Sequence, residues 1–530
     1  MYSAGEDVRR WVLPLVLEEQ ARVRPDQTFI SIVDGDSLTY GALHDQAAQV
    51  AGLLQQLGVQ PGDRVAIMLP NGLDIVRAWA GVGRLGAVAV MINTELLGAF
   101  LAHPLNDAQP CLLIIHADYL DRLEALGAPP PTIEHILVVG RPDKASSAYR
   151  PFEAWRSAGA TRAPFPAAQD AACIMYTSGT TGAPKGVIMP HAHCFLFGLG
   201  VVENLGVTGE DHYYIALPLF HANGLLMQLC GTMIAGAQAT VRDRFSASAW
   251  LADVRRAGAT LTHSLGAISA FILAQPPSPQ DRDHRLRLIL SAPNFADHER
   301  IWRERFGVSE VLGAYGMTEV NIPLYGERTK TRPGMCGRPY ARRFEVDIRD
   351  PDTDLPVALG EVGEIMVRPL IANGFMAGYF NLPKKTVEAW RNFWFHTGDA
   401  GRMDAEGYVT FVDRIKDCIR RRGENISAAD IEASFMDLPG VAEIAAFAVP
   451  SDIDGGEDEI MMAIVAAPEA SITAEMIAAR AKARMPRFAM PRYVAFVSSL
   501  PKTGTEKVRK ADLKQAGVTP DTIDLTEFYK

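Results

Sequence analysis

The sequence predicts a layered α/β fold in a large N-terminal domain with several subdomains, followed by a smaller α+β domain at the C-terminus. Helix and strand signals alternate from the N-terminus to about residue 400. Several strand signals are continuous apolar runs, which are typical of strands covered on both faces. The chain has 530 residues, 48% of them hydrophobic. This length is too great for one ordinary core and predicts two or more folding units.

The first clear helix signal starts after Thr39, whose side chain can cap the N-terminus of a helix, and it ends at Gly58. Apolar residues recur between them at the spacing of a helix: Leu43, Ala47, Val50, Leu54 and Leu57. Buried strands are then predicted at residues 65–69, 111–115 and 136–139, which are apolar runs separated by polar or proline-rich loops.

A glycine-rich segment, residues 176–187, follows the apolar run 171–175 and so leaves the end of a strand, where ligands commonly bind in α/β folds. Glycines let backbone amides approach an anion, while hydroxyls and a lysine add donors and positive charge. The segment predicts a phosphate-binding loop made of Thr177, Ser178, Gly179, Thr180, Thr181, Gly182 and Lys185. It is not the Walker loop of P-loop NTPases, because Pro184 precedes Lys185 and Gly186 follows it. Taken alone, the segment also fits an ordinary turn.

A domain boundary is predicted where charged residues crowd together from Asp413 onward, because a compact unit of roughly one hundred residues follows. We therefore expect domains at residues 1–413 and 414–530. In the second domain, Ser427 can cap a helix that carries Ile431 and Phe435, and residues 444–449 and 460–465 have strand signals.

Composition excludes several classes of function. The net charge is −10, and no basic stripe offsets it, so nucleic acid is not expected as a partner. The six cysteines have no metal-ligand spacing and do not predict a disulfide framework. The apolar run at residues 12–17 is too short to span a membrane, and no targeting segment is evident, so we expect a cytoplasmic protein without a membrane span.

Four further blocks follow the glycine-rich segment: residues 217–221, 315–319, 395–399 together with 413–417, and 501–507. In this order, the five blocks resemble the motifs of the AMP-forming adenylate synthetases, the family of acyl-CoA synthetases, firefly-type luciferases and stand-alone adenylation domains. The resemblance covers essentially the whole chain. Residues 420–427 look closest to carnitine/crotonobetaine-type and other acyl-CoA ligases.

The resemblance implies an AMP-forming acyl-CoA synthetase that uses ATP, Mg²⁺ and coenzyme A. A carboxylate attacks the α-phosphorus of ATP and pyrophosphate leaves; the CoA thiol then attacks the acyl carbonyl and AMP leaves. The resemblance also implies that the C-terminal domain is mobile about a hinge near Lys416. The expected partners are a small-molecule carboxylic acid, ATP and CoA, and a homodimer is left open.

The resemblance also assigns roles to individual residues. In the nucleotide site, residues 177–185 hold the β- and γ-phosphates, Tyr315 packs against adenine with Gly313, Ala314 and Gly316 beside it, Thr318 contacts the α-phosphate, Glu319 binds magnesium, and Asp399 and Arg414 contact the ribose. His221 is a gate beside the acyl pocket, Gly423 and Glu424 line the pantetheine tunnel, and Lys507 is the catalytic lysine of adenylation.

The residue types suit these roles. An aspartate can bind a diol with both oxygens, a carboxylate is a hard ligand for magnesium, and a tyrosine offers a stacking face. The sequence departs from the family pattern at Glu506, where a glycine commonly precedes the catalytic lysine. This carboxylate could weaken Lys507 by pairing with it, or could face solvent.

Several alternatives stay open. An acyl-AMP ligase that loads the pantetheine of a carrier protein would differ only in its acceptor, and a luciferase-type enzyme would differ in its second step. A catalytically inactive acyl- or nucleotide-binding protein would keep the fold without the chemistry. Medium-chain, alicyclic, aromatic and carnitine-like acids are all compatible with the sequence, because small changes in a pocket redirect specificity.

Overall fold

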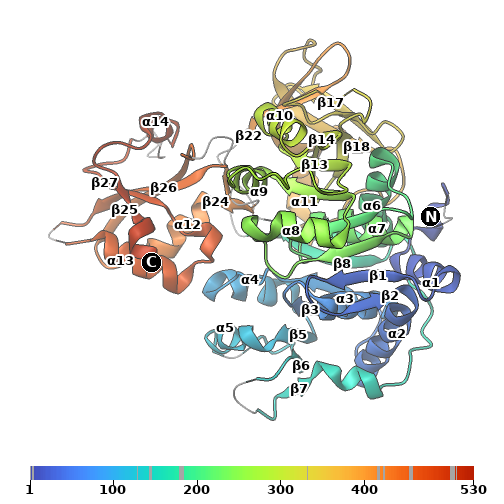
Figure 1. Ribbon diagram of the computed structural model, residues 1–530. Coiled ribbons are helices and arrows are strands. Elements are labelled where there is room, and N and C mark those ends of the chain that lie inside the picture. The colour runs from blue at the N-terminus through green and yellow to red at the C-terminus, as the bar shows by residue number, and fades with distance from the viewer. Residues whose placement is uncertain are drawn as a thin grey trace. The chain divides into compact units, whose positions relative to one another are not determined.

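The structure is a computed structural model, and it describes residues 2, 5–127, 129–142, 146–177, 184–330, 332–414, 418–421, 424–452, 457–468, 470–501, 508 and 510–530 (Figure 1). The chain forms two compact units. The first comprises Met1–Thr94, Leu105–Tyr176 and Gly186–Asp413; the second comprises Glu95–Pro104, Thr177–Lys185 and Arg414–Lys530. The sequence did not predict that two short segments of the N-terminal part would group with the C-terminal unit. Lys416, the proposed hinge, lies outside the described residues.

The first unit contains a sheet in the order β19-β9-β8-β4-β3-β5-β6-β7, in which the run from β8 to β7 is parallel. Its strands are β3 (Arg64–Met68), β4 (Val88–Met91), β5 (Leu112–His116), β6 (His135–Val139), β7 (Tyr149–Pro151), β8 (Ala171–Thr177), β9 (Lys185–Pro190) and β19 (Gly378–Tyr379). The predicted strands at residues 65–69, 111–115 and 136–139 are therefore confirmed to within one residue, and they are neighbours.

A second sheet of this unit has the order β16-β15-β14-β13-β12-β10-β11-β1-β2. Its strands are β1 (Thr28–Ile32), β2 (Ser37–Thr39), β10 (His212–Ile215), β11 (Gln238–Val241), β12 (Leu261–Leu265), β13 (Leu288–Ala292), β14 (Glu310–Met317), β15 (Asn321–Tyr325) and β16 (Arg338–Pro339). Strands β10, β12, β13 and β14 run parallel, so their carboxyl ends meet at one edge.

A third, antiparallel sheet joins β17 (Phe344–Arg349), β18 (Gly363–Pro369), β20 (Trp390–Arg391), β21 (Trp394–Met403) and β22 (Val409–Arg414). The α-helices outside the C-terminal segment are α1 (Leu13–Val23), α2 (Tyr40–Gln56), α3 (Leu73–Leu85), α4 (Gly98–Ala108), α5 (Leu120–Glu124), α6 (His191–Leu205), α7 (Cys230–Ala235), α8 (Ala247–Ala257), α9 (Gly266–Leu273), α10 (Ala296–Glu304) and α11 (Pro383–Ala389). A π-helix, η4, spans Asn223–Leu229, and short 3-10 turns are η1 (Val8–Arg10), η2 (Ala117–Tyr119) and η3 (Phe152–Ser157).

The helix predicted after Thr39 is α2. The Thr39 side chain accepts a hydrogen bond from the backbone of Ala42, which is the capping contact expected from the sequence. The helix packs against α1 and α3, and the apolar positions Leu43, Ala47 and Val50 are buried. Hydrophobic spacing alone therefore identified the buried face of this helix.

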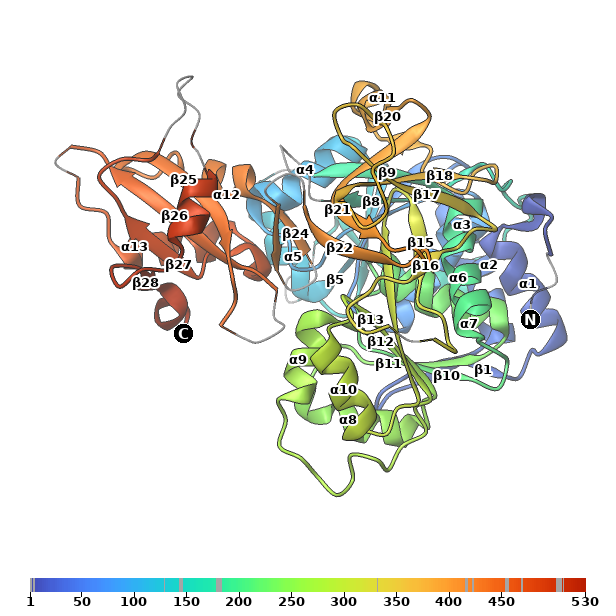
Figure 2. The same cartoon turned by 90° about the horizontal axis from the view of Figure 1, so that it is seen from above.

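The second unit has a sheet in the order β25-β26-β27-β28 and a hairpin of β23 and β24 (Figure 2). These strands are β23 (Cys418–Arg421), β24 (Glu424–Ser427), β25 (Val441–Val449), β26 (Glu459–Ala466), β27 (Tyr493–Phe496) and β28 (Ile523–Asp524); the helices are α12 (Ala428–Phe435), α13 (Ala474–Arg484) and α14 (Lys510–Ala516), with turns η5 (Arg487–Ala489) and η6 (Leu525–Tyr529). The predicted helix after Ser427 is α12, and its Ile431 and Phe435 are buried in the core of this unit.

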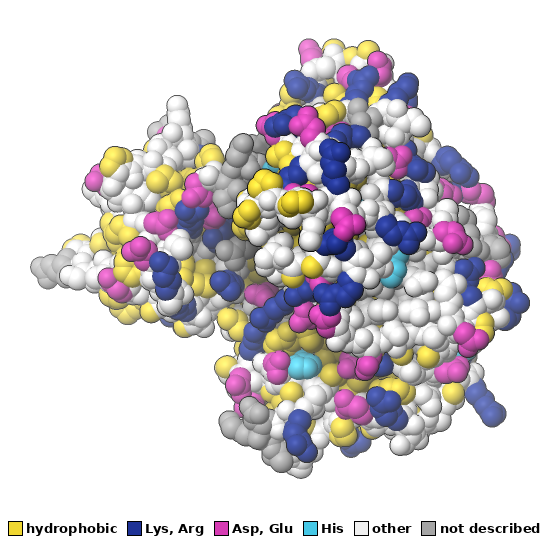
Figure 3. All heavy atoms as spheres, in the orientation of Figure 1, with side chains coloured by type: hydrophobic (Ala, Val, Ile, Leu, Met, Phe, Trp, Pro, Cys, Tyr) yellow, Lys and Arg dark blue, Asp and Glu magenta, His cyan; other side chains and the backbone are white. Residues whose placement is uncertain are grey.

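Charged side chains of both signs are interspersed on the face shown in Figure 3, where the described residues form no continuous basic stripe. None of the helices in the described ranges has the length and apolarity needed to cross a bilayer. The five cysteines whose side chains are described are free thiols: Cys111, Cys173, Cys194, Cys230 and Cys336.

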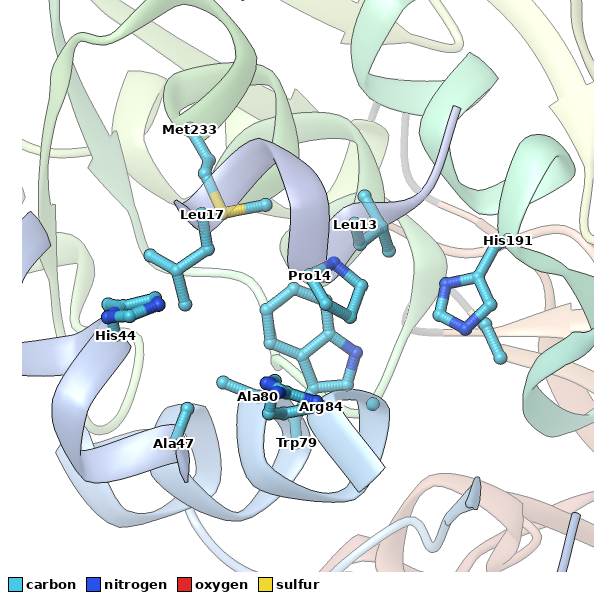
Figure 4. A pocket seen from close by; sticks show the side chains of 12 residues that line it. Leu13, Pro14, Leu17, His44, Ala47, Trp79, Ala80, Arg84, His191 and Met233 are labelled. Atoms are coloured by element: carbon cyan, nitrogen blue, oxygen red, sulfur yellow. The ribbon is translucent and has the colours of Figure 1, made fainter. Parts of the chain in front are cut away.

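His191, the first residue of α6, faces a pocket lined mainly by apolar side chains of α1, α2 and α3 (Figure 4). The imidazole is 1% exposed, and neither ring nitrogen has a hydrogen-bond partner. Burial lowers the pKa of His191 to about 4, with a smaller opposing effect from Asp170. The folded protein therefore holds this side chain neutral at pH values where an unfolded chain would protonate it.

This burial predicts a loss of stability in mild acid. Between about pH 6.5 and pH 4, unfolding would bind a proton at His191, so the free energy of unfolding falls as the pH falls through this window. The variant His191→Leu should have a melting temperature that depends less on pH between 4 and 6.5. The measurement is a series of thermal unfolding curves of the parent and the variant between pH 4 and pH 6.5. If the melting temperatures of both proteins depend equally on pH, His191 does not cause the loss of stability in acid.

Candidate active site

The carboxyl end of β14 carries most of the predicted nucleotide-binding residues. Gly313, Ala314, Tyr315 and Gly316 lie in this strand, and Thr318 and Glu319 lie in the turn to β15. The edge is crowded with backbone: a Cβ on Gly313 would lie 2.1 Å from the carbonyl oxygen of Met335. A side chain at this position would displace the backbone opposite, so the glycine is required by the packing of the site.

Tyr315 reaches across to a residue of the third sheet. Its hydroxyl donates a hydrogen bond of 2.7 Å to Oδ2 of Asp399 in β21, and both side chains are buried. The backbone N–H of Asp399 donates to the hydroxyl oxygen of Thr397 (3.1 Å), which itself donates to the carbonyl oxygen of Ile365 (2.6 Å). The carboxylate is therefore held in a fixed orientation beside the tyrosine ring.

The ring of Tyr315 also faces Phe411 of β22, with the ring centroids 6.4 Å apart and the planes at 29°. Phe411 carries no functional signal in the sequence, because one aromatic residue in a strand usually belongs to the core. Its side chain is 36% exposed, however, so it contributes an accessible apolar surface next to Tyr315.

Glu319 is buried, and hydrogen bonds fix both its side chain and its backbone. The hydroxyl of Tyr379 donates to its Oε1 (3.0 Å), and the backbone N–H of Met376 donates to its carbonyl oxygen (3.0 Å). A carboxylate held in this way is oriented before any ligand binds, which lowers the cost of ordering it later.

His193 of α6 contacts the backbone of the same turn, which joins β14 to β15. Its Nε2 lies 2.8 Å from the carbonyl oxygen of Thr318, and its Nδ1 lies 2.8 Å from that of Gly374. Burial lowers the pKa of His193 to about 4, while the two backbone contacts act in the opposite direction. The imidazole thereby lies between the turn that carries Glu319 and the segment that carries Met376. Because the neutral ring carries one N–H, it donates to one of these two carbonyl oxygens and packs against the other. Sequence reasoning missed His193 and Tyr379, because each resembles an ordinary buried residue of an apolar element.

The strands that flank the predicted phosphate-binding loop lie side by side, since Thr177 ends β8 and Lys185 begins β9. Ser178, Gly179, Thr180, Thr181 and Gly182 lie outside the described residues. His103 of α4 contacts Pro184, the residue before Lys185: its Nε2 lies 2.7 Å from the carbonyl oxygen of Pro184.

Of the remaining predicted site residues, the structure describes His221 but not the side chains of the others. His221 follows β10 in the chain, is half-buried and packs its ring on Phe220, with centroids 4.6 Å apart. Asn71 fixes the preceding segment, since it donates to the carbonyl oxygen of Leu217 (3.0 Å) and accepts from the backbone N–H of Leu219 (2.8 Å). Lys507 and Gly423 lie outside the described residues; Arg414 and Glu424 lie in β22 and β24, and their side chains are not described.

A comparison with protein-family models shows the family of the chain. The model of the AMP-binding enzyme family matches residues 17–380, and the model of the AMP-binding enzyme C-terminal domain matches residues 430–507. The chain belongs to the AMP-binding enzyme family. The expected membership in the adenylate-forming enzymes is therefore confirmed, and so is the prediction that the protein is an enzyme.

Individual relatives of this AMP-binding enzyme extend over nearly all of its length. The chain is 30% identical over 485 residues to a crotonobetaine/carnitine–CoA ligase of Salmonella paratyphi A, an alignment that covers 90% of this chain and 93% of the relative. The solved structure of the anthranilate CoA ligase AuaEII with anthranoyl-AMP is 27% identical, with a TM-score of 0.72 over 95% of this chain and 97% of that chain.

The o-succinylbenzoate CoA synthetase MenE of Bacillus subtilis, bound to its product analogue OSB-NCoA, is 25% identical. Its TM-score is 0.81, over 94% of this chain and 98% of that chain. These structural matches confirm the predicted α/β fold with a large N-terminal part and a smaller C-terminal part.

Proposed function

We propose that the protein is an AMP-forming acyl-CoA synthetase. In the first half-reaction, a carboxylate oxygen attacks the α-phosphorus of ATP, the bond from that phosphorus to the bridging oxygen breaks, and pyrophosphate leaves. In the second, the sulfur of CoA attacks the acyl carbonyl, the thiol gives up its proton, and AMP leaves. The observation that carries the proposal is the buried Tyr315–Asp399 pair, together with the buried and oriented Glu319 in the turn after β14, in a member of the AMP-binding enzyme family.

The Tyr315–Asp399 pair suits the nucleoside part of ATP. A carboxylate binds neighbouring hydroxyls with both oxygens, and the Tyr315 hydroxyl keeps Asp399 in one orientation. The faces of Tyr315 and Phe411 offer apolar surface for the adenine ring. Thr318 follows Tyr315 by three residues, and its carbonyl oxygen lies 2.8 Å from Nε2 of His193. Its hydroxyl can donate a hydrogen bond to the α-phosphate.

The residues also suit a magnesium ion held jointly with the nucleotide. The described residues contain no cluster of three or more His, Cys, Asp or Glu side chains that could hold a metal by themselves. Magnesium in nucleotide sites commonly takes one or two carboxylates, with phosphates and water as its other ligands, so the single oriented carboxylate of Glu319 fits this role. When bound, the ion would neutralise charge on the phosphates.

The variant Glu319→Gln should raise the magnesium concentration required for half-maximal activity by about tenfold, because an amide oxygen is a poorer ligand for a hard cation than a carboxylate. The measurement is pyrophosphate release against Mg²⁺ concentration, together with calorimetry of MgATP binding. Tyr379→Phe is the matched control, since it keeps the carboxylate and removes the hydroxyl that orients it. Superimposable Mg²⁺ curves for Glu319→Gln and the parent would place the metal on another residue.

The names of the relatives support CoA as the acceptor, because the relative from Salmonella and both solved structures are CoA ligases or synthetases. A carrier-protein pantetheine is the alternative acceptor. The test is a panel of medium-chain, alicyclic, aromatic and carnitine-like acids, first with pyrophosphate release and then with free CoA or a holo-carrier as the acceptor. Thioester formation with free CoA is the expected result. Pyrophosphate release followed by transfer only to the carrier would overturn the choice of acceptor, and no release with any acid would favour an inactive binding protein.

A further inference from the structure

Asp399, which we assign to the ribose, lies in an irregular part of the third sheet. Met366 of β18 pairs with His396 of β21. Glu364, two residues before Met366, pairs with Ala400, so two steps along β18 correspond to four steps along β21. The extra residues of β21 form a β-bulge that contains Asp399. Bulges redirect side chains and are common beside active sites.

A bulge removes backbone N–H groups from the hydrogen-bond ladder, and here side chains replace the missing partners. The backbone N–H of Gly398 donates to Oε1 of Glu364 (2.8 Å). The N–H of Asp399 donates to the hydroxyl oxygen of Thr397 (3.1 Å), and this hydroxyl donates to the carbonyl oxygen of Ile365 on β18 (2.6 Å). Since buried backbone groups need hydrogen-bond partners, Glu364 and Thr397 together maintain the conformation of the bulge.

The contact with Glu364 matters because little else restricts Gly398. This residue has a φ of 73°, in the left-handed region that glycine adopts without steric cost. Apart from its chain neighbours, no atom of the described residues would lie within 4 Å of a Cβ at this position. A glycine in open space can adopt many conformations, so the hydrogen bond to Glu364 selects the observed one.

The carboxylate of Glu364 is itself held through its second oxygen. Glu364 is 4% exposed, and its Oε2 lies 2.9 Å from Nδ1 of His396. A carboxylate oxygen only accepts, so Nδ1–H of the imidazole is the donor. Nε2 of the same ring lies 3.5 Å from Oδ1 of Asp354, which accepts from the guanidinium of Arg391 (3.4 Å). Glu364 therefore connects a buried polar cluster to the bulge.

The bulge in turn determines where the Asp399 carboxylate points. A contact with two neighbouring hydroxyls requires both carboxylate oxygens to be placed to within about 0.5 Å. The Tyr315 hydroxyl orients the end of the side chain, whereas the bulge orients the backbone from which it starts. A residue that holds the bulge can therefore affect nucleotide binding without touching the nucleotide.

We propose that Glu364 is a positioning residue for the ribose contact. Through the Gly398 amide it holds the bulge that directs Asp399, and it thereby contributes to the selection of a nucleotide that carries both ribose hydroxyls. This inference rests on the proposed function and adds a residue that acts through Asp399.

The test measures pyrophosphate release, with an acid that the parent accepts, from ATP and from 2′,3′-dideoxy-ATP, which lacks both ribose hydroxyls. The parent should prefer ATP by about 100-fold or more in kcat/KM. Glu364→Met keeps the length of the side chain and removes both oxygens, so it should raise the KM for ATP and reduce this preference by about tenfold or more. Its kcat/KM for the dideoxy nucleotide should stay within about threefold of the parental value, because that nucleotide makes no contact that Glu364 could improve. A variant that is merely misfolded would lose activity with both nucleotides alike.

Three further variants define the role of the carboxylate. Glu364→Gln keeps an oxygen for the Gly398 N–H, so it should keep the preference for ATP to within about threefold. Glu345→Met is the matched control, because Glu345 lies in β17 of the same sheet and pairs with Arg368 (2.6 Å); it should behave as the parent does. Glu364→Asp withdraws the oxygen from Gly398 by one methylene and should reduce the preference, which keeps the test decisive if thermal unfolding shows that Glu364→Met does not fold.

A double variant tests whether Glu364 acts through Asp399. In the Asp399→Asn background, Glu364→Met should change kcat/KM for ATP by less than about threefold, because two residues that serve one contact are not additive. Fully additive losses would overturn the inference.

The outcomes separate this inference from the proposed function. If the parent releases no pyrophosphate with any acid, the proposed function fails. If it releases pyrophosphate but uses both nucleotides equally well, the ribose assignment of Asp399 fails, and the role of Glu364 fails with it. If a folded Glu364→Met or Glu364→Asp keeps the parental preference, Glu364 does not position the ribose contact.

Discussion

Replacing Asp399 by alanine is expected to raise the KM for ATP by about 10- to 100-fold, which corresponds to losing hydrogen bonds to a charged group. The reason is that Asp399 is the carboxylate we assign to the ribose, and the Tyr315 hydroxyl holds it in place at 2.7 Å. The measurement is ATP-dependent pyrophosphate release at saturating acid. An unchanged KM and kcat for ATP would show that another group binds the ribose.

Two matched variants separate binding from folding at this position. Asp399 is 3% exposed in β21, so alanine would leave a buried gap, whereas Asp399→Asn keeps the shape and removes the charge. Tyr315→Phe keeps the ring and removes only the hydroxyl that orients Asp399. If the carboxylate binds the ribose directly, Asp399→Asn should impair ATP use more than Tyr315→Phe, while both variants melt close to the parent.

The sequence was informative where a local pattern determines the structure. The capped helix α2 and the strands β3, β5 and β6 were predictable because hydrophobic spacing and apolar runs encode which side of an element is buried. The predicted residues in and after β14 come together for the same reason: they are contiguous in the chain, and a parallel strand brings its carboxyl end to the ligand-binding edge.

Contacts between distant segments could not be predicted in this way. The Tyr315–Asp399 bond joins residues 84 positions apart, and the contact of His193 with the carbonyl of Thr318 spans 125 positions. Nothing in the local sequence around His193, Tyr379 or Phe411 distinguishes them from core residues.

Substitution of Lys507 by alanine is the prediction that separates the two half-reactions. Lys507 matches the catalytic lysine of the family and lies outside the described residues. Removing one preorganised charge contact should slow the formation of acyl-AMP by about 10² or more. Supplied with synthetic acyl-AMP and CoA, the same variant should still form the thioester at nearly the parental rate, because this lysine acts only in the first step if the C-terminal domain rotates.

The converse variant is Lys416→Pro, at the proposed hinge. Proline fixes φ and stiffens the backbone, so this variant should keep adenylation and lose thioester formation. Equal loss of both half-reactions in both variants would contradict alternation between two domain positions. Full adenylation by Lys507→Ala would instead mean that the neighbouring Glu506 marks a real departure from the family and that another cation neutralises the phosphates. In that case the variant Glu506→Gly, which restores the residue common in the family, should leave the adenylation rate unchanged.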